Sequence, residues 1–364
     1  QGALTVGTDW FRESRKGALA DSATTNFNAS GDVTSVTTSP LAQTAPDATQ
    51  TDVGLFVHHD WDPSPKLTVS TGGRLDYIRT TSKTSPVIAP QLQAAYERGK
   101  ESSELPLTGA IGLIYRPWDI LHFTANVGKA FRAPSTIESF GSSRQGAGFN
   151  VPNPDLKSEE GVTYEVGTRL RLSIVHANVT AFRSDYTNFV IRQPITFQGL
   201  PSFQNQNAGG ARMQGVEFDA TWVITAGWEV LTNAAYLYGT DTGTGRPLSY
   251  VPPFNGLLGA RYTLPEKGAY VEGVTKWSLR KDRIDSALER ETAGYVVLNL
   301  YAGMDLWNVS SGLPDMRLRL ALENILNQAF RQPTTVEDIR FLGGNANPLV
   351  EPSRAFSIAL TSRF

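Results

Sequence analysis

The 364-residue chain has no cysteine, only four histidines and no apolar run of about 18 residues. The missing cysteines exclude disulfides and thiolate metal sites, and the missing apolar run excludes a transmembrane helix. Neither sign of charge predominates, since 33 Lys and Arg residues stand against 35 Asp and Glu residues. This balance removes the basic surface that a nucleic-acid-binding protein needs, so nucleic acid is not an expected partner.

Signatures of common catalytic sites are missing as well. The chain contains no H-E-x-x-H zinc motif, no G-x-S-x-G nucleophile elbow and no phosphate-binding loop. His58 and His59 fall in a candidate strand, while His122 and His176 fall near short turns on strands that are not neighbours. Because metal ligation needs convergent side chains, we expect no metal site, no cofactor and no enzyme.

The residues that are abundant favour β-structure. The 33 glycines, 17 phenylalanines, 12 tyrosines and 7 tryptophans suit many strands and turns. Alternation with period two predicts about fourteen strands, and their lengths reach the about 9 to 11 residues that a tilted strand needs to cross a membrane. The predicted strands span residues 3–12, 51–62, 66–80, 105–116, 119–130, 159–171, 174–191, 211–224, 227–239, 254–263, 268–280, 292–306, 315–326 and 352–364.

The connections between these strands alternate strictly between short and long. Short connections are expected at 63–65, 117–118, around 173, and at 225–226, 264–267 and 307–314. Long ones are expected at 13–50, 81–104, 131–158, 192–210, 240–253, 281–291 and 327–351. An up-and-down membrane barrel has this asymmetry, with short periplasmic turns and long extracellular loops. The sequence therefore predicts an all-β fold, a transmembrane antiparallel up-and-down barrel.

Tryptophan positions and strand alternation support the same fold. Five of the 7 tryptophans lie beside short turns, and Trp10 and Trp277 lie near the opposite strand ends, as in the two aromatic belts of a membrane barrel. In the last strand Phe356, Ile358 and Leu360 share one face, and polar or small residues share the other. Charged residues that alternate with leucines in 315–326 must then face a polar lumen.

Three stretches resemble one family. The first combines Phe131, Arg132, Ala133 and Pro134 with Asn153, Pro154, Asp155 and Leu156, followed by a strand that contains Tyr164-Glu165-Val166-Gly167. The second has a G-x-F, W, G-x-R-x-D pattern in 54–77, and the third is Glu323-Asn324-Ile325-Leu326-Asn327 with a terminal aromatic, Phe364. In this order the three resemble TonB-dependent outer-membrane receptors. The resemblance implies a 22-stranded barrel, filled by a plug domain, in the outer membrane of a Gram-negative bacterium.

If the resemblance holds, residues 1–364 form the C-terminal part of one barrel domain, about fourteen of the 22 strands, and the plug, the TonB box and the first strands lie upstream. The first and last strands would then not be neighbours, and the sheet would have open edges. Implied partners are the TonB complex, outer-membrane lipid, the barrel-assembly machinery that recognises Phe364, and a small-molecule or metal-chelate substrate.

The first motif has a structural interpretation and a functional one. Its prolines fix backbone angles and end strands, and Arg132 and Asp155 could pair to hold the loop ends. Ligand contacts are expected from Arg144, Gln145, Phe149 and Asn150 in the middle of this loop. Further loop aromatics that could stack on a chelate or a sugar, or pack against each other, are Tyr96, Phe140, Phe149, Phe197, Phe203 and Phe341.

The resemblance implies import of a scarce nutrient, and a ferric siderophore is the favoured class. Haem receptors of this family carry a histidine between the two halves of the first motif, and residues 135–152 contain none, which disfavours haem. Cobalamin, copper and small glycans stay open. Two alternatives also remain: a complete fourteen-stranded passive channel, and a soluble β-rich binding protein or hydrolase.

Overall fold

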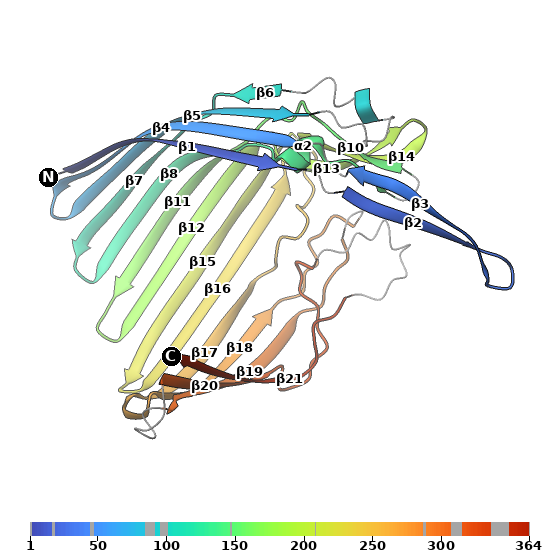
Figure 1. The fold of residues 1–364 in the computed structure, drawn as a ribbon. Coiled ribbons are helices and arrows are strands. Elements are labelled where there is room, and N and C mark those ends of the chain that lie inside the picture. Colours follow the sequence, from blue (N-terminus) through green and yellow to red (C-terminus); the bar gives the residue numbers. More distant parts are fainter. Residues whose placement is uncertain are drawn as a thin grey trace.

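The computed structural model consists almost entirely of antiparallel β-sheet (Figure 1). No helix in the described part of the chain is both long and apolar enough to cross a membrane. The structure describes residues 2–16, 19–43, 47–83, 92–94, 101–145, 148–207, 209–286, 289–306, 315–335 and 349–363.

The main sheet has 15 strands. Fourteen of them are hydrogen-bonded to one another in the order in which they occur in the chain, and β6 (Glu101–Glu104) pairs only with β5. The long period-two segments of the sequence form these strands, and the predicted set is confirmed with ends that differ by a few residues. Their bounds are β1 (Gly2–Arg15), β4 (Ala48–Ser64), β5 (Leu67–Ser82), β7 (Leu107–Trp118), β8 (Leu121–Arg132), β11 (Glu159–Arg171), β12 (Val175–Thr187), β15 (Gly210–Thr225), β16 (Trp228–Asp241), β17 (Asn255–Leu264), β18 (Ala269–Ser278), β19 (Tyr295–Asp305), β20 (Asp315–Glu323) and β21 (Ala355–Arg363).

The main sheet is an open, curved wall. Strands β1 and β21 stand at the two ends of the hydrogen-bonded order, and in Figure 1 they form the two separate edges of the wall. The expectation of open edges is confirmed within the described residues. A complete fourteen-stranded channel would need a ladder between β1 and β21, so the structure does not support that alternative.

One predicted strand, 174–191, is wrong in its extent. The structure divides it into β12, which ends at Thr187, and β13 (Val190–Phe197), which belongs to a different sheet. Asn188 between them has a φ of 56°. Asparagine tolerates this left-handed conformation, which turns the chain out of the strand direction.

The long connections contain secondary structure that alternation did not predict. One carries a hairpin of β2 (Leu19–Phe27) and β3 (Val33–Gln43). Two others build a four-stranded sheet in the order β13-β14-β10-β9, beside the short helix α2 (Thr136–Phe140). Figure 1 places these elements at one end of the wall, which we call the loop end. The added strands are β9 (Ser143–Gln145), β10 (Gly148–Val151) and β14 (Leu200–Asn207).

Short connections join the strands at the opposite end, the turn end. Residues 65–66, 119–120, 173–174 and 226–227 form tight turns, and the 3-10 helix η1 (Pro265–Lys267) forms another. Gly227 and Gly268 adopt φ values of 97° and 54° there, a region that glycine enters at little cost. The predicted asymmetry is confirmed for the described connections, and the short connection predicted at 307–314 lies outside the described residues.

The outer face of the wall is apolar over most of its extent. Register pairs place Val6 opposite Val57, Leu320 opposite Ile358, and similar pairs on the strands between them. Several side chains of this face are among the most exposed of the described residues: Val6 is 64% and Ile358 62% exposed. An exposed apolar face of this extent suits lipid and not water, so the soluble alternative fails. Exposed tryptophans are Trp10, Trp61, Trp118, Trp222 and Trp228.

The inner face carries the polar and charged residues that the alternation predicted for the lumen. Arg261 on β17 reaches Glu272 on β18 at 2.7 Å, and Arg317 on β20 reaches Asp305 on β19 at 2.6 Å. In the second motif the Arg74 guanidinium donates to Asp9 on β1 at 2.6 Å and to Asp76 at 2.9 Å. Such charges are tolerated on a face that is turned away from lipid, so the predicted polar lumen is confirmed.

The third motif forms the turn that follows β20. Asn324 is 4% exposed and has a φ of 49°. Its backbone N–H donates to Asn299 Oδ1 at 2.8 Å, and its side-chain amide donates to the Gln328 and Pro352 carbonyls at 2.9 and 3.2 Å. Asparagine therefore supplies both the left-handed backbone and the bonds that return the chain toward β21. The predicted assembly signal Phe364 lies outside the described residues.

Candidate functional site

The first half of the first motif leads from β8 into a capped helix. Ala133 and Pro134 leave the strand, and Ser135 is the N-cap of α2. The Ser135 hydroxyl accepts from the Glu138 N–H at 3.2 Å, and the Ser135 N–H donates to Glu138 Oε2 at 2.8 Å. This reciprocal capping box fixes the start of the helix. It directs Phe140, which is 1% exposed, into a small apolar core at the loop end.

Arg132 connects three elements at the loop end. Its Nε donates to Glu159 Oε2 on β11 at 2.7 Å, and its Nη1 and Nη2 donate to the two Glu138 oxygens at 2.8 and 3.0 Å. The expected pairing with Asp155 is wrong, because these two glutamates are closer to the guanidinium. Burial acts to raise the pKa of Glu138, but hydrogen bonds from Arg132 and Ser135 outweigh burial and lower this pKa below its usual 4.5.

The second half of the motif ties the same loop to β14. Two hydrogen bonds position Asn153. Its backbone N–H donates to the Ser139 carbonyl at 2.9 Å, and its side-chain amide donates to the Asn205 carbonyl at 2.8 Å. Asn205 in turn donates to the Glu138 carbonyl at 2.9 Å. Pro154 is half-buried, Leu156 is 5% exposed, and the exposed Asp155 donates its N–H to Asn153 Oδ1. Every one of these contacts is internal to the loop end.

The predicted ligand residues lie on the small four-stranded sheet. Arg144 and Gln145 belong to β9, and their side chains lie outside the described part. Phe149 packs edge to face on Phe197 with ring centroids 6.1 Å apart, and Asn150 donates to the Gly141 carbonyl at 3.0 Å. The two described side chains thus contact protein, and the ligand role of all four stays a prediction.

The other predicted loop aromatics either contact protein or lie outside the described residues. Phe140 and Phe197 belong to the apolar core or pack against it. Phe203 lies under Arg192, whose guanidinium carbon is 4.3 Å from the ring centroid. Tyr96 and Phe341 lie outside the described residues. The structure therefore uses the described aromatics in contacts between loop segments.

Sequence reasoning missed a cavity of about 720 Å³ at the loop end of the inner face. Segments 189–194 and 244–251 form most of its wall, and Met213 and Asp241 contribute from β15 and β16. Arg192, Arg246 and Tyr250 supply cationic and aromatic groups, and Arg246 Nη1 lies 3.5 Å from Asp285 Oδ2. Three loops that are distant in sequence meet here, so no local pattern could indicate the cavity.

A buried ion pair supports one wall of this cavity. Lys281 Nζ and Glu289 Oε1 are 2.7 Å apart, and the two side chains are 3% and 5% exposed. Glu289 Oε1 also accepts from the Tyr250 N–H at 2.6 Å, and Lys281 also donates to the Pro333 carbonyl at 3.3 Å. Because a buried charge is stable only with its partner, this pair holds segment 244–251 against Lys281 and Glu289.

The cavity has the size and chemistry of a small-molecule site. Sites for small molecules measure about 300 to 1,000 Å³ and combine apolar walls with a few polar groups. Arginine binds carboxylate and phosphate oxygens, and aromatic rings stack on flat ligands. No histidine is among the residues that line it, and no group of three or more potential metal ligands occurs within the described ranges. The lining thus combines two arginines with two aspartates, Asp241 and Asp285, beside the Tyr250 ring.

Known proteins resemble this chain over most of its length. Residues 1–325 match the family description "TonB dependent receptor-like, beta-barrel". The hemoglobin-haptoglobin utilization protein B of Neisseria meningitidis is 19% identical over 82% of this chain and 42% of that protein. The ferric enterobactin receptor PirA of Pseudomonas aeruginosa is 23% identical over 99% of this chain and 47% of that protein. The chain thus spans less than half the length of these curated relatives.

Solved structures share the fold. The copper transporter OprC superposes with a TM-score of 0.77 at 19% identity, covering 100% of this chain and 54% of that one. The FrpB iron transporter from Neisseria meningitidis superposes with a TM-score of 0.63 at 16% identity, covering 87% and 46%. The family match, the apolar outer surface and the polar inner face agree: this chain belongs to the TonB-dependent receptor β-barrel family of Gram-negative outer-membrane proteins.

Proposed function

We propose that the chain is the C-terminal part of the barrel of an outer-membrane receptor that binds a metal chelate at its extracellular end and imports it with energy transmitted by TonB. The observation that carries this proposal is the cavity of about 720 Å³, which opens between loops above a polar inner face. On this reading the loop end is extracellular, because membrane barrels place long loops there.

The rest of the receptor follows from the same proposal. Residues 1–364 act as one barrel segment, and the remaining strands, a plug and a TonB-binding segment belong to the longer protein. The open edges at β1 and β21 support this arrangement, because an exposed sheet edge is costly in a membrane. The barrel-assembly machinery would recognise the terminal aromatic Phe364. The motif residues Arg132, Asn153 and Leu156 would hold the extracellular sheet in place.

A ferric siderophore is the proposed substrate class. Two relatives are named for haemoglobin-haptoglobin utilisation and for ferric enterobactin, and two structural neighbours are named for copper and iron, so metal or metal-chelate uptake recurs among them. The residues that line the cavity include Arg192 and Arg246 beside Asp241 and Asp285, and no histidine. Arginines suit the anionic oxygens of a siderophore complex, whereas haem iron needs an axial ligand such as histidine.

Uptake by the full-length receptor tests the proposal. Cells that lack their own iron receptors and express the full-length protein are given ferric enterobactin or haem labelled with radioactive iron, with and without TonB. We expect accumulation of the ferric siderophore only when TonB is present. Arg192→Gln with Arg246→Gln should weaken siderophore binding about tenfold. The matched control, Lys276→Gln with Arg319→Gln, removes the same charge from the inner face away from the cavity.

Three results would contradict the proposal. Accumulation that is independent of TonB would indicate a passive channel. Accumulation of haem alone would overturn the substrate class. Equal binding by the cavity variant and its control would remove the cavity from the binding site.

A further inference from the structure

A charged cluster interrupts the apolar outer face near the extracellular end. On the outer face, Lys129 pairs with Val162, Val162 pairs with Asp185, and Asp185 pairs with Arg212, so the four residues form one row across neighbouring strands. The next row passes through Arg183, and Glu160 lies beside Lys129 at the start of β11. We call Lys129, Glu160, Arg183, Asp185 and Arg212 the rim cluster. These five residues stand on four adjacent strands where a lipid-facing barrel surface would otherwise be apolar.

Ion pairs hold the rim cluster together and leave basic groups exposed. Lys129 Nζ lies 2.9 Å from Glu160 Oε2, and Asp185 accepts from Arg183 Nε at 2.7 Å and from Arg212 Nε at 2.6 Å. The three basic side chains remain 40%, 48% and 41% exposed in the order Lys129, Arg183 and Arg212. With three cations against two carboxylates, the cluster has a net positive charge and presents it outward.

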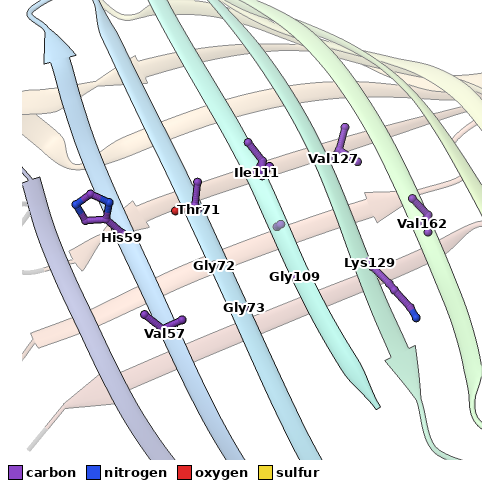
Figure 2. Close-up of a pocket in the computed structure, with 11 residues that line it drawn as sticks. Val57, His59, Thr71, Gly72, Gly73, Gly109, Ile111, Val127, Lys129 and Val162 are labelled. Atoms are coloured by element: carbon purple, nitrogen blue, oxygen red, sulfur yellow. The ribbon is translucent and has the colours of Figure 1, made fainter.

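A shallow hollow adjoins the rim cluster on the same face. Gly73 and Gly109 pair with each other across β5 and β7 and form its floor, since neither has a side chain. Apolar side chains surround the floor, and the volume is about 490 Å³. Figure 2 shows the hollow across neighbouring strands, with His59 toward one end and Lys129 toward the other. The apolar wall residues are Val57, Ile111, Val127 and Val162.

The hollow and the rim cluster form one continuous surface, and the hollow lies farther from the extracellular ends of the strands than the cluster does. Gly73 lies near the middle of β5, Lys129 lies three residues before the extracellular end of β8, and Arg212 lies two residues from that of β15. Gly109 pairs with Lys129, so the floor of the hollow meets the cluster directly. Because barrel strands are tilted, one register row rises through the membrane as it crosses them. The row therefore runs from mid-membrane apolar surface to charged rim.

We propose that this surface binds one phosphorylated lipid of the outer leaflet, with an acyl chain in the hollow and the phosphate on the rim cluster. Arginine and lysine bind phosphate oxygens through charge-assisted hydrogen bonds, and basic groups at a membrane surface attract anionic lipid. Because Gly73 and Gly109 have no side chains, the floor of the hollow leaves space for an acyl chain. The proposal rests on the proposed membrane location and orientation, but it concerns a surface on the opposite side of the wall from the substrate cavity.

Lipid retention by the full-length receptor tests the site. The receptor is purified from outer membranes in mild detergent, and bound phosphorylated lipid is measured by native mass spectrometry. The variant Lys129→Gln, Arg183→Gln, Arg212→Gln should retain about tenfold less. The control Arg171→Gln, Lys276→Gln, Arg319→Gln removes three charges from the inner face and should retain the wild-type amount.

A second pair of variants tests the hollow without altering charge. Gly73→Leu fills the floor, and an added Cβ there meets only the Thr108 carbonyl oxygen at 4.0 Å, so the strand has room for it. Gly273→Leu adds the same side chain to the outer face on β18, where the nearest atom is 3.4 Å away. We expect Gly73→Leu to lower lipid retention several-fold and Gly273→Leu to leave it unchanged.

The outcomes separate this site from the proposed transport function. Equal lipid retention by the rim-cluster variant and its inner-face control would overturn the lipid site, whatever the uptake result. Retention of lipids without phosphate in equal amount would also overturn it, because the cluster would then have no selectivity. Loss of siderophore uptake in the cavity variant with normal lipid retention would concern the substrate site alone.

Discussion

The guanidinium of Arg74 lies across Gly54 on the neighbouring strand. A Cβ at Gly54 would be 2.0 Å from Arg74 Nη2 and 2.7 Å from Asp76 Oδ1. The glycine of the G-x-F stretch and the arginine and aspartate of the G-x-R-x-D stretch are therefore parts of one contact. Arg74 reaches Asp9 on β1 only because Gly54 on β4 leaves room above the sheet.

Gly54→Ala should destabilise the barrel by about 1 to 3 kcal/mol, because the new methyl group displaces the Arg74 side chain from its two carboxylates. The measurement is urea unfolding of the full-length receptor in lipid, followed by its migration on unheated gels. Gly73→Ala is the matched control on the adjoining strand, where no atom lies closer than 4.0 Å to the added Cβ. Equal midpoints for the two variants would show that the contact does not constrain Gly54.

The Lys281–Glu289 pair should be sensitive to removal of one partner. Lys281→Met leaves the Glu289 carboxylate buried without its cation, and this should destabilise the loop end by about 3 to 5 kcal/mol. Amide exchange across 244–251 and 281–289 should then accelerate. Adding Glu289→Gln should recover much of the loss, because a neutral amide can still accept from Tyr250 N–H. No recovery in the double variant would contradict this account.

The α2 cap should depend on pH through Glu138. Its folded pKa is lowered, so its stabilising contribution is present above the unfolded value of 4.5 and is lost as the pH falls through the lower folded pKa. Protease resistance of the loop end should therefore decline in acid. Glu138→Gln should remove this acid-dependent step and lower resistance at neutral pH. An unchanged acid profile in that variant would assign the step to other groups.

Ser135→Ala should weaken the same helix without changing its charge. The variant loses the hydroxyl that accepts from the Glu138 N–H, and caps of this kind contribute about 1 kcal/mol. Amide exchange of 136–140 should increase while barrel unfolding stays the same, because α2 lies outside the main sheet. Ser30→Ala, at an exposed position of another loop, offers a comparison. A shift in the barrel midpoint would show that α2 also supports the wall.

The strands, their alternating faces and the two kinds of connection were determined by the sequence itself. A strand repeats every two residues, so Phe356, Ile358 and Leu360 identify its apolar outer side locally. The family motifs could also be recognised from short stretches of sequence, since they involve glycine, proline and asparagine at fixed positions. The break at Asn188 was missed because asparagine also occurs within strands, and only its left-handed backbone separates β12 from β13.

Tertiary structure decided the contacts between distant segments. Arg132 selects Glu138 and Glu159 over Asp155 because α2 and β11 meet beside the end of β8. The loop-end cavity joins three loops, and the hollow with the rim cluster joins seven strands through their register. Alternation specifies which face a residue occupies but not which residues lie beside it, because register and loop packing depend on the summed interactions of the whole sheet.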